Sequence, residues 1–228
     1  VDMIHRFVAT GTKSPVPVIN WRNDLRRSLT VVDIVTRDRN SLFEKLTGAF
    51  SIAGLNILGA RAVTRKDGLA IDVFYVEDKN GGVVDDIKVR EHCETSIRSF
   101  LSDEVAPDKL ISEKRKKADR TRRFSSEDKL GEKIPSQVDV YRDVSLNRTI
   151  VEVRAPDQVG LLHLIAKTIS KCGFSIQFAR IATEQGIATD IFNIEPLKTK
   201  ETFSPSRFLE LREDLSTALY EGKFYHEV

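Results

Sequence analysis

Hydrophobic and polar residues form the same succession of patterns twice along this chain. In the first passage, residues 29–36 alternate, with Val32 and Ile34 on one face and Asp33 on the other, as in a half-buried β-strand. Apolar residues then recur at helical spacing, namely Leu42, Phe43, Leu46, Ala49, Phe50 and Ala53. This stripe predicts an amphipathic helix with one buried side, and Gly54 is a natural stop just past its end.

The second passage repeats the first 119 residues later (157 − 38), without a gap, so that Asp38 corresponds to Asp157 and Arg61 to Arg180. Its helical stripe consists of Leu161, Leu162, Ile165, Thr168, Ile169 and Cys172, and it stops at Gly173. Solenoid repeats have periods of roughly 20–50 residues. A spacing as long as this one therefore indicates a duplicated domain.

Two strand patterns and a second helical pattern complete each copy. The strand patterns cover 56–64 and 69–76 in the first copy, and 175–183 and 187–194 in the second. Short glycine-containing turns separate the members of each pair, as expected of β-hairpins. The second helices are predicted near 85–102 and 205–220. This succession indicates an α+β protein with two ferredoxin-like βαββαβ domains, whose antiparallel sheets carry helices on one face.

The fourth strand of each domain is predicted late in its copy. Residues 137–141 alternate valine with polar residues, and we assign them to the first domain. In the second domain the corresponding strand is 224–228, at the end of the chain. Residues 1–28 form a lead-in segment, in which 16–21 can add an edge strand beside 29–36.

These assignments place the first domain at 29–142 and the second at 143–228. The first domain includes a stretch at 107–135 that is rich in charge and poor in apolar residues. We interpret this stretch as an exposed connector with a helical part around 112–123.

Composition limits the kind of protein without identifying it. Hydrophobic residues make up 40% and charged residues 31% of the 228 positions, and the formal net charge is only +2. Two cysteines, Cys93 and Cys172, do not suggest a disulfide framework. No stretch approaches the roughly 18 apolar residues of a membrane span, and the N-terminus lacks the apolar core of a signal peptide. Because the chain begins at Val1, we expect either a processed product or a fragment of a longer protein, and we favour the fragment.

The loop between the first strand and the first helix of each copy is the strongest candidate site. A helix N-terminus presents unpaired backbone N–H groups and a partial positive charge, which suit a carboxylate. In the second copy, Gly160 allows close approach of a ligand, and Asp157 can cap the helix or accept a hydrogen bond from an ammonium group. The alternative is that Asp38 and Asp157 are only turn or cap residues and that Gly160 is only a steric convenience.

Nucleic-acid binding is not indicated. The basic run at 114–123 is interrupted by Asp119 and followed by a single aromatic residue, Phe124, so we interpret it as a solvated linker face. RNA-recognition modules of similar topology need basic and aromatic residues on their third strand, whereas the strand at 69–76 contains Asp72 and no Lys or Arg.

Catalytic and metal-binding patterns are not found in the sequence. The four histidines are scattered without metal-ligand spacing, and His163 lies off the apolar stripe, where an exposed or loop-facing side chain is expected. There is no P-loop, nucleophile elbow or dinucleotide-binding run. We predict no catalytic residue, no metal ligand and no cofactor in this chain.

Each copy resembles an ACT domain, whose pattern runs Asp-x-x-Gly-Leu-Leu/Phe, then Gly-Leu-x-Ile, then Ala-x-Ile/Val-x-Thr. The tandem is more closely similar to the C-terminal regulatory region of the bacterial PII-protein uridylyltransferase/uridylyl-removing enzymes. The stretches that carry this resemblance are 36–43, 54–61 and 67–74, together with the basic connector before the second copy.

The resemblance implies a cytoplasmic nitrogen sensor that pairs its ACT domains within or between chains and contacts neither membrane nor nucleic acid. In that family, separate catalytic domains transfer UMP from UTP to the PII protein or remove it, with Mg²⁺, and the ACT pair binds glutamine. The alternative is an ACT-type sensor of another amino acid, or a stand-alone ACT protein. Ser41 in place of Gly160 makes the first site the less open one. The residues expected to bind the ligand are Asp157, Gln158, Val159, Gly160, Leu161, Leu162, Ser175, Gln177, Asp38, Arg39, Asn40, Ser41 and Asn56.

Overall fold

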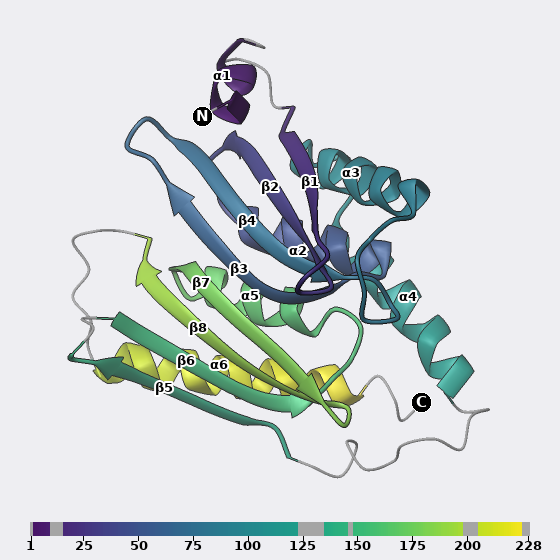
Figure 1. The fold of residues 1–228 in the computed structure, drawn as a ribbon. Helices are drawn as coiled ribbons and strands as arrows, with labels where there is room; N and C mark the ends of the chain where they lie inside the picture. The colour runs from purple at the N-terminus through teal and green to yellow at the C-terminus, as the bar shows by residue number, and fades with distance from the viewer. Residues whose placement is uncertain (1, 10–15, 123–134, 146–147, 198–204, 225–228) are drawn as a thin grey trace. The chain divides into compact units, whose positions relative to one another are not determined.

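The chain divides into two compact units, Val1–Glu113 and Lys114–Val228. The structure, a computed structural model, describes residues 2–9, 16–122, 135–145, 148–197 and 205–224. Each unit has four antiparallel strands and two long helices that lie on one face of its sheet (Figure 1). The predicted α+β class, with antiparallel sheets and helices on one face, is confirmed.

The first unit arranges its strands in the order β1-β2-β4-β3. The strands are β1 (Val18–Asp24), β2 (Leu29–Arg37), β3 (Asn56–Thr64) and β4 (Leu69–Glu77), and the helices are α1 (Asp2–Ala9), α2 (Leu42–Ala53) and α3 (Ile87–Leu101). Strand β4 pairs with both β2 and β3, so the hairpin β3–β4 folds back beside β2. The elements predicted between residues 29 and 102 are all present, with ends that differ by no more than two residues.

The second unit arranges its strands in the order β5-β6-β8-β7, which is the order of the equivalent strands in the first unit. The strands are β5 (Gln137–Asp143), β6 (Arg148–Pro156), β7 (Phe174–Glu184) and β8 (Ile187–Pro196), and the helices are α5 (Leu161–Lys171) and α6 (Pro205–Phe224). The duplication read from the sequence therefore extends to the order of the strands.

The predicted fourth strands are the main error of the sequence interpretation. Strand β5 pairs with β6, with Val138 opposite Val153, so the strand at 137–141 belongs to the sheet of the second unit and not to the first. The first unit takes its edge strand from the lead-in segment, where β1 pairs with β2 as anticipated for 16–21. The prediction of a strand at 224–228 is wrong for Phe224, which is the last residue of helix α6. Residues 225–228 lie outside the described residues.

Each unit consequently runs strand, strand, helix, strand, strand, helix. Its sheet has the strand order of a ferredoxin-like βαββαβ domain. The edge strand that comes last in the sequence of such a domain comes first in the sequence of each unit here. An alternating pattern identifies a strand but not the strand with which it pairs. Strand β5 ends at Asp143 and β6 begins at Arg148, so β6 is the strand closest to β5 in the sequence.

The helical stripes lie in the cores of the two units, as their spacing predicts. Leu46 and Phe50 of α2 are fully buried, and the ring centroid of Phe50 is 4.8 Å from that of Phe74 on β4. In the second unit, Ile165 and Ile169 of α5 are fully buried as well. These four helix residues anchor α2 and α5 on their sheets by apolar burial.

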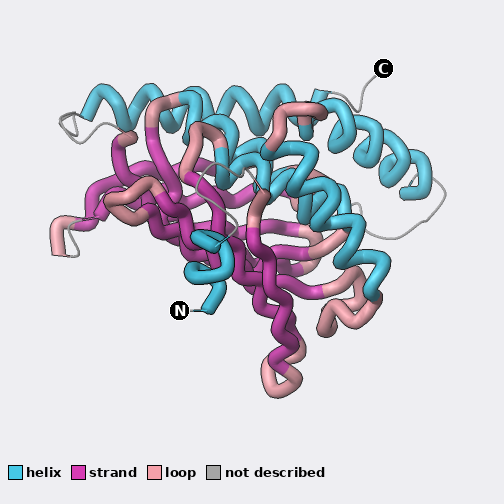
Figure 2. The backbone as a smooth tube through the Cα atoms, turned by 90° about the horizontal axis from the view of Figure 1, so that it is seen from above, coloured by secondary structure: helices cyan, strands magenta, loops and turns pink. Residues whose placement is uncertain are grey.

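A short helix at the N-terminus covers the other face of the first sheet. Phe7 of α1 is 1% exposed and belongs to a cluster with Val35 and Leu69. Met3, Ile4, Val18 and Ile71 pack around that cluster. Figure 2 shows α1, beside the N-terminus, on the opposite side of the first unit's strands from that unit's longer helices. The sequence analysis treats this segment only as a lead-in and does not predict the helix.

The connector is helical over a longer stretch than predicted. Helix α4 (Pro107–Arg122) begins before the expected 112–123, and Ile111 is only 4% exposed, so this part of the connector is not wholly solvated. The remaining connector residues, 123–134, lie outside the described residues.

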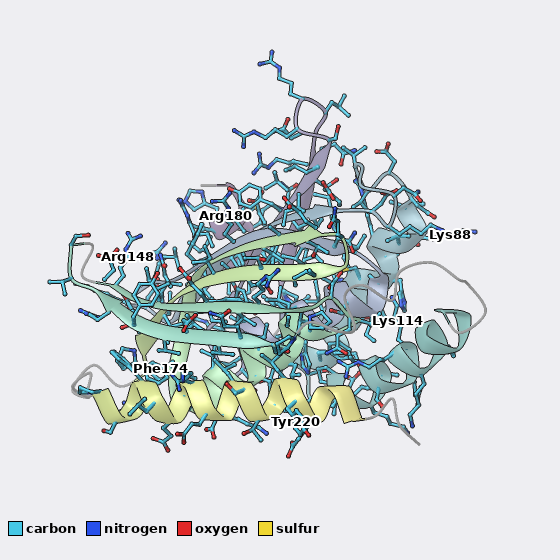
Figure 3. All side chains as sticks on the ribbon, turned by 90° about the horizontal axis from the view of Figure 1, so that it is seen from below. Lys88, Lys114, Arg148, Phe174, Arg180 and Tyr220 are labelled. Carbon is cyan, nitrogen blue, oxygen red and sulfur yellow. The ribbon has the colours of Figure 1, made fainter. Side chains whose placement is uncertain are left out.

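Helix α6 packs its apolar side on α5 and β5 and leaves the other side open. Leu211 and Leu215 are fully buried, whereas Tyr220 is 61% exposed. Figure 3 shows Phe174 of β7 near this helix, and the Arg207 guanidinium lies 4.7 Å from the centre of the Phe174 ring. Within the described part of the chain, no helix combines the length and hydropathy needed to cross a membrane.

Candidate functional site

The loops that lead into α2 and α5 have the same backbone shape. The N-cap residues are Ser41, with φ 60°, and Gly160, with φ 81°, and both are left-handed. Neither helix start has a side-chain cap hydrogen bond. Asp38 and Asp157 lie three residues earlier, so neither is the N-cap residue. The alternative that these aspartates are turn residues of the loop stays beside the ligand-binding hypothesis.

Each loop is held against the hairpin turn of its own unit. The backbone N–H of Asp38 donates to the carbonyl oxygen of Gly68 at 2.9 Å, and that of Asp157 donates to Gly186 at 2.8 Å. The candidate site of each unit therefore lies at the end of the sheet where its second hairpin turns.

The basic connector helix reaches the loop of the second unit. Arg115 of α4 donates from Nε and Nη2 to the carbonyl oxygen of Val159, at 3.1 and 3.0 Å. Because a trans peptide directs its N–H away from its C=O, this contact turns the N–H of Gly160 away from Arg115. Lys114, labelled in Figure 3, is half-buried, and burial lowers its pKa. The prediction of a solvated basic face is wrong for these two residues.

The loop of the first unit is tied to the end of α3. Arg39 donates from Nη1 to the carbonyl oxygen of Leu101, and the Lys45 ammonium lies 2.5 Å from Asp103 Oδ1. Asp38 and Asn40 are exposed. The two loops thus share their backbone shape but are braced by different side chains.

The strand residues predicted to complete the site lie at the other end of the sheet. Ser175 donates to the carbonyl oxygen of Glu195 at 3.3 Å, and Gln177 donates to Ser175 at 3.0 Å. Ser175 stands nine positions before Glu184, where β7 reaches the hairpin turn, a distance of about 30 Å at about 3.3 Å per residue. Asn56 starts β3 in the same way. The structure does not bring Ser175, Gln177 or Asn56 to the loop of their own unit.

The remaining predicted residues contribute through the backbone. Leu161 and Leu162 are 3% and 9% exposed, so their side chains belong to the core, while Gln158 and Val159 are half-buried. The N–H of Leu161 donates to the carbonyl oxygen of Gln158 at 3.1 Å. His163 follows in the same turn and is 3% exposed, contrary to the expectation of an exposed or loop-facing side chain.

Two aspartates that the sequence analysis does not assign to the site are buried on the hairpins. Asp72 of β4 and Asp190 of β8 are 2% and 1% exposed and stand at equivalent positions in the two hairpins. Burial raises the pKa of each to about 7, and the nearby carboxylates of Asp38 and Asp157, respectively, raise it further. The signal was present in the sequence: an acidic residue at an inward position of an alternating strand pattern.

Nucleophilic and metal chemistry find little support among the described residues. No group of three or more His, Cys, Asp and Glu side chains there is arranged to hold a metal ion. Burial raises the pKa of the Cys93 thiol, and burial with a hydrogen bond to Asp214 raises that of Cys172 to about 12. Both thiols are therefore protonated at neutral pH, the form that is the weaker nucleophile.

Comparison with known proteins gives one consistent result. The chain is 30% identical over 203 residues to the bifunctional uridylyltransferase/uridylyl-removing enzyme of Azospirillum brasilense, covering 88% of this chain and 21% of that enzyme. The enzyme of Caulobacter vibrioides is 31% identical over 195 residues, covering 84% of this chain and 20% of the enzyme. That of Rhodospirillum rubrum is 25% identical over 218 residues, covering 95% and 22%. The resemblance seen in the sequence is confirmed.

The chain spans about a fifth of the length of these relatives. No family model matches it. Among solved structures, an unknown protein from Galdieria sulphuraria aligns over 85% of this chain and 92% of its own, with 13% identity and a TM-score of 0.25, which is too low to compare the folds.

Proposed function

We propose that this chain is the amino-acid-sensing regulatory region of a bifunctional uridylyltransferase/uridylyl-removing enzyme. The observation that carries the proposal is the match of 84–95% of this chain to about a fifth of each such enzyme. The duplicated α+β domain, with a left-handed loop entering a helix in each copy, fits a binding role. In this view the parts of the relatives beyond the match carry the UTP- and Mg²⁺-dependent chemistry.

Glutamine is the proposed ligand, and the second unit is the proposed main site. The ligand carboxylate would meet backbone N–H groups at 159–162, where the start of α5 adds partial positive charge. Arg115 brings a guanidinium to the same loop through the Val159 carbonyl. Gly160 leaves the approach open, whereas Ser41 places side-chain atoms at the matching point of the first unit.

Regulation follows because binding of the ligand is thermodynamically linked to the arrangement of the two ACT domains. A ligand that prefers one arrangement of the ACT pair shifts the parent enzyme toward it by the ratio of the two affinities. We propose that glutamine favours the state that removes UMP from the PII protein, in the cytoplasm. The contacts of the chain with its parent catalytic domains, and of the parent with PII, belong to the same proposal.

Calorimetric titration of the purified chain with the common amino acids tests this function. We expect saturable heat with glutamine and a weaker response with the others. Asp157→Ala is expected to lower the affinity, while the matched Asp38→Ala in the first unit is expected to lower it less. Tighter binding of a different amino acid would replace glutamine as the ligand, and the absence of binding by all of them would refute the sensing role.

A further inference from the structure

A carboxylate is buried in the middle of the second sheet without full hydrogen bonding. Asp190 of β8 is 1% exposed, and its cross-strand neighbours are apolar, Val153 on β6 and Ile181 on β7. The N–H of Ala182 donates to the carboxylate, but Oδ1 has no partner among the described residues. Burying such a group costs several kcal/mol when it is ionised and unpaired, on the order of the penalties for isolated polar groups. A buried orphan of this kind indicates a function beyond packing.

The carboxylate lies next to the candidate loop. Burial and, after it, the charge of Asp157 raise the pKa of Asp190 to about 7, so Asp190 is about half protonated near neutral pH. The other charged or titratable side chains at this loop are Arg115, which binds the Val159 carbonyl, and the buried His163. Asp190 stands on the strand that begins directly after Gly186, whose carbonyl oxygen accepts from the backbone N–H of Asp157 at 2.8 Å, so its hairpin is bonded to the loop.

The first unit also buries an aspartate at the equivalent position of its hairpin. Asp72 is 2% exposed on β4, and the charge of Asp38 raises its pKa as well. The hydroxyl of Thr36, fully buried on the neighbouring strand β2, also has no hydrogen-bond partner among the described residues. Both copies keep a buried acid at this position of the hairpin, which argues against an accident of packing in one of them.

We propose that Asp190, together with Asp157, binds the primary ammonium group of the amino-acid ligand in the second unit. The inference rests on the proposed function and names the part of the site that recognises the amine. An ammonium group carries three N–H donors and one positive charge, which match the orphaned Oδ1 and the surplus of negative charge. Binding favours the ionised form of Asp190, so the fraction of a proton that Asp190 holds near neutral pH passes to the buffer as the ammonium group enters.

The test compares two ligands and two proteins. The ligands are glutamine and glutaramate, which is glutamine with hydrogen in place of the α-ammonium group. The proteins are the wild-type chain and Asp190→Asn, which keeps the shape of the side chain without its charge. Asp33→Asn serves as the control, because Asp33 lies on the outer face of β2 and pairs with Arg22. Thermal unfolding of each variant verifies that it is folded.

We expect the wild type to bind glutamine at least tenfold more tightly than glutaramate, and Asp190→Asn to bind both equally weakly. Calorimetry at pH 7 in phosphate and in Tris should report about half a proton released per glutamine in the wild type, since the pKa of Asp190 is about 7, and none in Asp190→Asn. A purely structural role for Asp190 would change neither the ligand discrimination nor the proton release.

The outcomes separate this inference from the proposed function. Unchanged glutamine affinity in folded Asp190→Asn would overturn the inference and leave glutamine sensing intact. A loss of affinity confined to Asp72→Asn would overturn the assignment to the second unit. If another amino acid binds in place of glutamine, the same comparison with that ligand and its deaminated form decides the role of Asp190. Failure of every amino acid to bind would overturn both proposals.

Discussion

Replacing Asp190 by asparagine should make the second unit more stable at neutral pH, even though the residue is buried. The ordinary pKa of an aspartate is 3.8, and in the folded chain burial and the charge of Asp157 raise the pKa of Asp190 to about 7. Folding therefore holds a proton that the unfolded chain gives up between these two values. Stability consequently falls as the pH rises from about 4 to about 7 and is level above that range.

The size of the effect follows from the shift. Roughly three pKa units at about 1.36 kcal/mol each give about 4 kcal/mol of stability lost by the wild type between pH 4 and pH 8. Asparagine has no proton to lose, so the variant escapes this part of the pH dependence. Its new amide needs hydrogen-bond partners, which costs about 1–3 kcal/mol at every pH. The net gain at pH 8 is then about 1–3 kcal/mol, and at pH 4 the variant has no advantage.

Urea unfolding at pH 4, 6 and 8 measures this difference. Circular dichroism or calorimetry is needed for Asp190→Asn, because the single tryptophan, Trp21, lies in the first unit. Trp21 fluorescence instead follows the matched variant Asp72→Asn, for which the same pH dependence is expected from the raised pKa of Asp72, about 7. A difference between wild type and variant that stays constant from pH 4 to pH 8 would refute the reasoning. So would a variant that is less stable than the wild type at pH 8.

Further predictions concern the loops, the cores and the chemistry. Ser41→Gly should stabilise the first unit by up to about 1 kcal/mol and Gly160→Ala should destabilise the second by about 1 kcal/mol, because both positions are left-handed; shifts of the same sign in denaturant midpoint would contradict this. Leu46→Ala and Ile165→Ala, at fully buried positions, should each cost about 2–5 kcal/mol in unfolding free energy, and unchanged melting would mean that the helix faces are misplaced. The chain alone should transfer no UMP from UTP to the PII protein with Mg²⁺; measurable turnover in a radiolabel assay would show a catalytic set that the sequence patterns do not reveal.

Local pattern determined the duplication of this protein and most of its secondary structure, although not helix α1. The stripes around Leu46 and Ile165 and the alternation at 29–36 depend only on the geometry of a helix and a strand, so they could be read without knowing any partner. The loop before each helix was also identified locally, because a helix start has the same unpaired N–H groups in any fold. The resemblance to the uridylyltransferase/uridylyl-removing enzymes rests on the same short stretches and is confirmed by similarity along most of the chain.

Only the tertiary structure decided which segments that are distant in the sequence pair or contact one another. A strand pattern does not say which edge it joins, so β5 was assigned to the wrong sheet, and Ser175 was placed near a loop that lies at the other end of β7. The contact from Arg115 to the Val159 carbonyl joins residues 44 positions apart and has no periodic signature. The role of Asp190 is of the same kind. Its burial, its orphaned oxygen and its raised pKa all arise from apolar neighbours and from Asp157, which are distant in sequence and adjacent only once the sheet has formed.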